Sequence, residues 1–278
     1  MSNLRIIYDN AIDRAVLTAS STAGSLVPAN MQVDRKSKVW RASGTSATVT
    51  ATWASAAQLI SGVMLPFCSL TSAATITVRC YSVATGGSPI YTLGPILAAP
   101  YTPLGMWSWG TIPLGVNAYS YGNNTYGRIW FDNTYSVKRV EIDISDPTNP
   151  LGYIEVGRMV AGSHWSPTYN TAFGIPVTFP DSSVQERTDS GDLVTTIGTR
   201  TKKLSFDLNW LVASDRNTFT SLMQHVGVSK PIFVSLFPND PDASKEQIYQ
   251  IYGKLPNVSQ MSHTMHTIYA SQINIEEV

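Results

Sequence analysis

A His-x-x-His pair, His263 and His266, is the first feature of this sequence that could do chemistry. Two histidines three residues apart can share a metal ion when both lie on one face of a helix. The residues around this pair have strand character, and residues three apart on a strand point to opposite faces. The spacing therefore disfavours a two-ligand metal site.

Three carboxylates, Glu141, Asp143 and Asp146, lie at the end of an alternating segment and beside a turn. Carboxylates close to turn carbonyls can hold calcium. The commoner explanation is a solvated strand face followed by a polar turn. We predict no metal and no cofactor, and calcium at these carboxylates stays open as the alternative.

His164 precedes Trp165 and could be taken for a catalytic base. No serine or cysteine has the sequence context of a nucleophile, and the sequence contains no G-x-S-x-G, no phosphate-binding loop and no H-E-x-x-H. We therefore predict no catalytic residues and expect that the protein is not an enzyme. A glycan-degrading enzyme remains an alternative, because its carboxylate pair leaves no reliable mark in a sequence.

The composition is unusual in its low charge. Of 278 residues only 14% are charged, about half the usual ~25%, and 19 basic residues balance 19 acidic ones. A neutral chain lacks the basic face that binding to nucleic acid requires. The polar surface of Ser, Thr, Asn, Gly and Tyr instead suits burial against other subunits or contact with sugars.

The chain has no predicted membrane span and no predicted secretion signal. The longest apolar stretch, residues 59–70, is too short to cross a bilayer, and the first residues lack an apolar core. Cys68 and Cys80 are expected to be buried, reduced thiols.

Most of the sequence predicts short strands. Alternating segments recur, as at residues 47–53, 75–81 and 137–144, and Gly- or Pro-containing turns separate them. We predict a mainly β fold with two domains, residues 1–160 and 161–278. The second has one helix at residues 214–226, which Ser214 caps and Gly227 ends. We expect this domain to be a β-sandwich or barrel.

Residues 86–124 are rich in Gly, Pro and aromatic residues, and their prolines leave little room for a central strand. We interpret this stretch as long loops. The candidate contacts for a glycan or a partner are its aromatic residues Tyr101, Trp107, Trp109, Tyr119 and Tyr121.

Residues 29–53, which contain Trp40 and Trp53 around an alternating strand, resemble the opening of galactose-binding-like (discoidin-type) jelly rolls. The resemblance implies a jelly-roll β-sandwich for the first domain. In it, Trp40 is expected in the core. Loops at one end of such sandwiches can hold a sugar.

Residues 140–167 resemble structural proteins of bacteriophage tail tips. The similar features are a strand, an Asp-Pro-Thr-Asn-Pro-Leu-Gly-Tyr turn and a Gly-Arg…Gly-Ser-His-Trp-Ser-Pro segment that contains Arg158 and Trp165. We expect these two residues at an interdomain or subunit interface, with an intrachain ion pair as the alternative for Arg158, whose planar fork suits carbonyls and carboxylates.

This second resemblance implies a virion component of the tail tip or baseplate, similar in role to distal tail proteins and assembled in the bacterial cytoplasm. Its implied partners are copies of itself in a ring and neighbouring tail-tube, baseplate-hub or fibre proteins, with host surface glycans as a further ligand. The alternative is a carbohydrate-binding module that recognises host envelope glycans.

Overall fold

The computed structural model describes residues 3–99 and 125–278, which fall into two compact units. Unit 1 comprises Met1–Ser166 and Ile232–Gln250, and unit 2 comprises Pro167–Pro231 and Ile251–Val278. The predicted division into 1–160 and 161–278 has a single boundary, whereas the chain enters unit 2 at Pro167 and returns to unit 1 for Ile232–Gln250. The cause is β17 (Ile232–Ser235), which pairs with β1 (Arg5–Ile7) across more than 220 residues of sequence.

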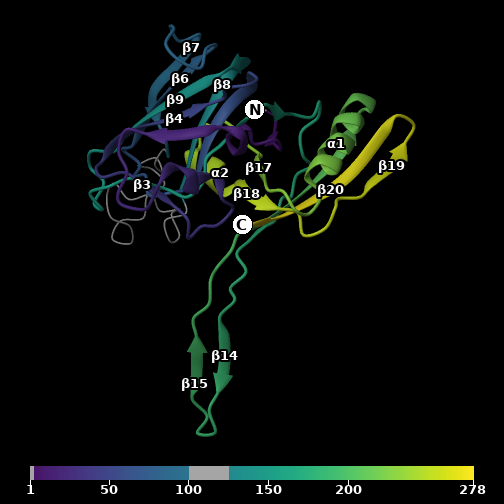
Figure 1. Cartoon of the computed structure of the whole chain (residues 1–278). Helices are drawn as coiled ribbons and strands as arrows, with labels where there is room; N and C mark the ends of the chain where they lie inside the picture. The colour runs from purple at the N-terminus through teal and green to yellow at the C-terminus, as the bar shows by residue number, and fades with distance from the viewer. Residues whose placement is uncertain (1–2, 100–124) are drawn as a thin grey trace. The chain divides into compact units, whose positions relative to one another are not determined.

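Unit 1 contains two antiparallel sheets that face each other as a β-sandwich (Figure 1). The first sheet has the order β2 (Val16–Ala19), β4 (Ser46–Thr52), β9 (Arg139–Ser145), β6 (Thr75–Tyr81) and β7 (Tyr91–Leu97). In the second, the long β5 (Gln58–Cys68) pairs with β8 (Thr125–Val137) on one side and with β11 (Val160–Gly162) and β10 (Glu155–Val156) on the other. β3 (Trp40–Arg41) completes this sheet by pairing with β10.

Alternation along the strands creates the core of the sandwich. Val140, Ile142 and Ile144 on β9 are buried, whereas the residues between them are partly exposed. Val63 and Leu65 on β5 belong to the same buried cluster. Trp40 is fully buried there, as expected. The prediction of a mainly β fold that begins with a sandwich is confirmed.

The interpretation of residues 86–99 as loop was wrong for one segment. β7 is a strand, although it contains Pro95. It lies at the end of its sheet, with β6 as its neighbour, and an edge strand tolerates a proline that a central strand would not.

Among the described residues of unit 1, two short helical segments and one α-helix accompany the strands. The 3-10 helices η1 (Ala11–Arg14) and η2 (Pro28–Gln32) lie in the segments that connect its first strands. The helix α2 (Ala243–Ile248) follows β17 and is held by the buried Glu246, which accepts hydrogen bonds from Arg128 at 2.8 Å (Nε) and 2.5 Å (Nη2).

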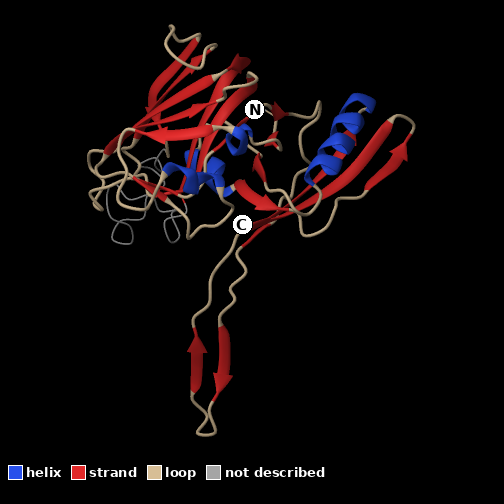
Figure 2. Ribbon diagram, in the orientation of Figure 1, coloured by secondary structure: helices blue, strands red, loops and turns tan. Residues whose placement is uncertain are grey.

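Unit 2 is one antiparallel sheet with a helix on one face (Figure 2). Its central strands are β16 (Lys203–Leu211) and β20 (Ile268–Glu277), flanked by β13 (Val177–Thr178), β18 (Gln250–Lys254) and β19 (Met261–Met265). The helix α1 (Ala213–Val226) buries Phe219, Leu222 and Val226. The sequence led us to expect a second sandwich or barrel, and in the structure a helix provides the facing layer.

Two local expectations about unit 2 fail for identifiable reasons. Strand alternation through the buried Leu204, Phe206 and Leu208 would put Trp210 inside as well, but Trp210 is 53% exposed. A register shift between Leu208 and Leu211 puts Leu211 inside in its place. Ser214 does not cap α1, because the helix begins one residue earlier and its N-cap position is Val212.

No helix in residues 3–99 or 125–278 combines the length and apolar character needed to cross a bilayer.

Candidate functional site

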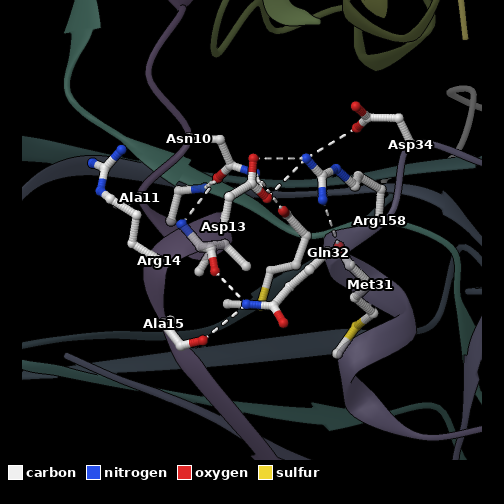
Figure 3. A network of polar contacts seen from close by, with 12 residues as sticks. Asn10, Ala11, Asp13, Arg14, Ala15, Met31, Gln32, Asp34 and Arg158 are labelled. Carbon is white, nitrogen blue, oxygen red and sulfur yellow. Dashed lines mark hydrogen bonds and ion pairs between the residues drawn. The ribbon is translucent and has the colours of Figure 1, made fainter. Parts of the chain in front are cut away.

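Arg158 is the centre of a polar network in unit 1 (Figure 3). Its side chain is 2% exposed. Nη1 donates to the carbonyl oxygen of Met31 at 3.1 Å, and Nη2 lies 2.9 Å from Asp13 Oδ1 and 3.0 Å from Asp34 Oδ1. One guanidinium thus joins η1, the end of η2 and the segment after η2.

The backbone places this side chain. The amide N–H groups of Gly157 and Arg158 donate to the carbonyls of Phe67 and Pro66 at the end of β5. A Cβ at residue 157 would lie 3.1 Å from the Phe67 side chain, so glycine permits the close approach.

Two amide side chains fix the helical segments around Arg158. Asn10 Oδ1 accepts from the N–H of Ile12 and of Ala161, which ties η1 to β11. Gln32 Nε2 donates to the carbonyls of Ile12 and Ala15, which ties η2 to η1. The network therefore holds the surface segments over one edge of the sandwich.

The electrostatics of the network are those of a structural clamp. Burial raises the pKa of the Asp13 carboxyl above its ordinary value, and the nearby Arg158 opposes that rise. A buried arginine needs such partners, because an unpaired charge away from water is costly. The structure therefore shows Arg158 in intrachain ion pairs, the alternative that its sequence context left open.

His164 has a serine partner. Its Nδ1 lies 2.5 Å from Ser61 Oγ, and its backbone N–H donates to the same oxygen at 2.9 Å. Burial lowers the pKa of His164 to about 4, with a smaller contribution from Arg5. Ser61 is fully buried. This geometry resembles a nucleophile and a base, but the serine is out of reach of a substrate.

The carboxylates considered for calcium have protein partners. Glu141 and Asp143 pair with Arg79 across the first sheet, at 3.3 and 2.7 Å. Asp146 is buried and accepts from the N–H and the hydroxyl of Thr71. Within residues 3–99 and 125–278 no group of three or more His, Cys, Asp or Glu side chains is arranged to hold a metal ion.

A partly exposed group of one aromatic and two charged side chains lies where β3 and β10 pair. The guanidinium carbon of Arg41 lies 4.1 Å from the centroid of the Tyr153 ring. Nε and Nη2 of Arg41 donate to Glu155 Oε1 at 2.9 and 2.6 Å. A guanidinium, a carboxylate and an aromatic ring thus share one surface. We name this group the Arg41 cluster.

Unit 2 carries a long hairpin that we call the arm, residues 179–201. β14 (Val184–Arg187) and β15 (Leu193–Thr196) pair only with each other among the described strands, and all of their residues are exposed. Figure 1 shows this hairpin standing apart from the sheet of unit 2. A ladder of eight residues without a packed face is marginal by itself in water.

The arm exposes apolar side chains along its length. Ile197 is 89% exposed, and Leu193 and Val194 are each 53% exposed. At its base Asp181 pairs with Arg200 at 2.9 Å, and hydrogen bonds from Ser182 to Thr199 continue the ladder. The base is thus ordered by polar contacts, while no described residue covers the apolar side chains of Leu193, Val194 and Ile197 to the extent of burying them.

The remaining predicted residues fall into two groups. The aromatic residues Tyr101, Trp107, Trp109, Tyr119 and Tyr121 lie outside the described residues. Trp165 lies on β12 (His164–Trp165), is 9% exposed, and occupies the register position opposite Ile6.

The two histidines of the His-x-x-His pair occupy the β19–β20 hairpin. His263 lies on β19, where its ring stacks on Tyr269, and His266 lies in the turn. Cys68 and Cys80 are buried and form no disulfide, and burial raises the pKa of these thiols to about 11 and about 12.

The sequence predicts the two strands of the arm but not their exposure, and it does not predict the Arg41 cluster. The signal for the arm was present, because two alternating segments flank the Thr-Asp-Ser-Gly-Asp turn at 188–192. Nothing local to residues 193–197 shows that their apolar side chains remain exposed. The Arg41 cluster depends on a pairing across 114 residues, which no local pattern reveals.

Comparison with solved structures gives weak overall similarity to sugar-binding modules. Chitosan-binding module 1 of a chitosanase/glucanase from Paenibacillus sp. IK-5 is 13% identical, with 56% of this chain and 99% of that chain covered and a TM-score of 0.36. The family 32 carbohydrate-binding module from C. perfringens NanJ, in complex with galactose, is 8% identical, with 55% and 96% covered and a TM-score of 0.38. A Streptococcus pneumoniae fucose-binding module is 9% identical, with 56% and 98% covered and a TM-score of 0.35.

No protein-family model matches the chain, and no curated protein matches its sequence.

Proposed function

We propose that this chain is a non-catalytic structural subunit of a larger assembly, which it joins through the arm. The observation that carries the proposal is the exposure of apolar residues on a hairpin that packs against no other described strand. Exposed hairpin edges and apolar side chains are characteristic of segments that pair with another chain. The low charge of the whole sequence suits large subunit contacts.

The finer assignment within this proposal is a component of a bacteriophage tail tip or baseplate. Its support is the sequence resemblance at residues 140–167. Copies of the chain in a ring, with tail-tube, baseplate-hub or fibre proteins as neighbours, are the partners that this role implies.

The experiment compares the full chain with a variant in which residues 182–199 are replaced by a two-residue Asn-Gly turn. The Asp181–Arg200 bridge brings the two ends together, so a short turn can close there. We expect electron microscopy and native mass measurement to show defined multi-copy assemblies for the full chain and monomers for the variant. A full chain that stays monomeric alone and in tail-particle extracts contradicts the proposal.

Antibody labelling of intact phage particles tests the finer assignment. Label at the distal end of the tail supports a tail-tip component. Label elsewhere on the particle, or none, contradicts it while leaving the assembly role intact.

Glycan binding by unit 1 is the second candidate function. The observation that favours it is the Arg41 cluster, because an aromatic ring beside paired polar groups can contact both the C–H face and the hydroxyls of a sugar. The structures reported above bind chitosan, galactose or fucose by their descriptions. Host envelope glycans are the corresponding ligands proposed for this chain.

Titration of purified envelope polysaccharide tests this second candidate. We expect saturable binding that Tyr153→Ala weakens by about tenfold or more, whereas Tyr169→Ala, an exposed tyrosine of unit 2, leaves it unchanged. Binding that Tyr153→Ala leaves intact, and that the double replacement Trp107→Ala with Trp109→Ala abolishes, would assign the site to the aromatic residues between 101 and 121. Absence of binding by the full chain removes the candidate.

A further inference from the structure

A basic segment follows η2 in unit 1. Three of the four residues 35–38 are basic: Arg35, Lys36 and Lys38. Arg35 and Lys38 are exposed, and in the part of the chain that the structure describes neither takes part in an ion pair. Lys36 lies 4.7 Å over the Phe67 ring. Arg35 and Lys38 therefore present two exposed positive charges that no acidic residue of the described ranges pairs with.

The basic segment is held in a fixed conformation. Its turn is closed by hydrogen bonds from the N–H of Lys38 to the Arg35 carbonyl at 3.0 Å and from the N–H of Arg35 to the Val33 carbonyl at 2.9 Å. Immediately before it, Asp34 is paired with the buried Arg158, as Figure 3 shows. A charged surface that is already ordered loses little conformational entropy when a partner binds.

The tip of the arm has the opposite charge. Glu186, Asp189 and Asp192 are all exposed, and Arg187 is the one basic residue between them. Three carboxylates and one guanidinium give a net charge of −2. Arg187 is turned to its own turn, where Nη1 donates to the Gly191 carbonyl at 2.9 Å.

We propose that the acidic arm tip of one copy binds the basic segment of a second copy. This inference rests on the assembly function proposed above and names the partner and the surface that receives the arm. Opposite charges on the two surfaces favour and orient such an encounter. Each copy has one arm and one basic segment, so the contact either closes reciprocally in a twofold dimer or repeats head-to-tail from copy to copy into a ring or a filament.

Charge reversal on each side, and on both together, tests this inference in the full chain. Asp189→Lys with Asp192→Lys is expected to weaken self-association on the order of 10–100-fold at low salt, and Arg35→Glu with Lys38→Glu is expected to do the same. The quadruple variant restores the opposite charges with exchanged signs and is expected to regain association. Lys230→Glu, an exposed lysine of unit 2, is the matched control and is expected to leave association unchanged.

Analytical ultracentrifugation at low and high salt measures the dissociation constant for every variant. Association that the Asn-Gly arm replacement abolishes but the basic-segment reversal does not weaken overturns this inference and leaves the assembly function standing. A full chain that assembles only with another protein also overturns it, because the partner is then not a second copy. Loss of association in both reversals without recovery in the quadruple variant contradicts direct pairing as well. A thermal unfolding curve for each variant confirms that it is folded.

Discussion

Unit 1 and the arm use the same residue types in opposite ways. Ile142 in the sandwich is fully buried, whereas Ile197 on the arm is 89% exposed. The Arg158 side chain is 2% exposed beside Asp13, whereas that of Arg200 is 69% exposed beside Asp181. Both regions are β-structure with apolar residues and arginine–aspartate pairs. The difference is that the sandwich supplies its own second layer, whereas the apolar residues of the arm are exposed in the described chain.

The largest expected difference between the two regions concerns isoleucine. Ile142→Ala leaves a cavity in the sandwich and should lower the free energy of unfolding by about 2–5 kcal/mol. Ile197→Ala removes an already hydrated side chain and should change it by less than about 0.5 kcal/mol. Urea denaturation, followed by tryptophan fluorescence, measures both. Equal effects would mean that the arm is packed within its own chain.

A smaller difference is expected for the two arginines. Arg158→Ala leaves two carboxylates and three helical or loop segments without their clamp, and should cost about 3 kcal/mol. Arg200→Ala breaks an exposed pair and should cost no more than about 0.5 kcal/mol. Urea denaturation measures the free energy of unfolding of both variants. A cost below 1 kcal/mol for Arg158→Ala would show that the network adds little to stability.

A third expected effect depends on pH. The pKa of His164 in the folded protein is about 4, below the ordinary value of 6.5, so between these values the unfolded state binds the additional proton. Stability from this group is therefore fully present above pH 6.5 and is lost as the pH falls toward 4. His164→Gln should flatten the pH dependence of the free energy of unfolding in this window.

His266→Gln is the matched control, because His266 is an exposed histidine in the turn of the β19–β20 hairpin. The His266→Gln variant should retain the pH dependence of the free energy of unfolding that the unmodified protein shows. An unchanged slope in His164→Gln would show that burial does not keep His164 neutral.

The sequence predicted those features that local patterns encode. Alternation identified the buried face of β9, and the apolar spacing that ends at Gly227 identified α1. The buried position of Trp40 followed from the resemblance of its surroundings to a jelly roll.

Features that depend on distant pairing could not be predicted. The return of residues 232–250 to unit 1 requires the pairing of Ile6 with Val234, and the bulge that exposes Trp210 depends on how β16 meets β20. The network of Arg158 illustrates both cases. The residue was singled out because a planar fork suits carbonyls and carboxylates, but its partners are 124 to 145 positions away.

The interrupted course of unit 1 has a consequence for synthesis on the ribosome. β1 is the first strand to be translated, and one of its two neighbours, β17, emerges more than 220 residues later. A truncated product that stops anywhere in residues 167–231 therefore has an open edge on β1 and cannot complete unit 1. Only a nascent chain translated through Gln250 contains every segment of the first unit, so shorter translation products cannot complete it.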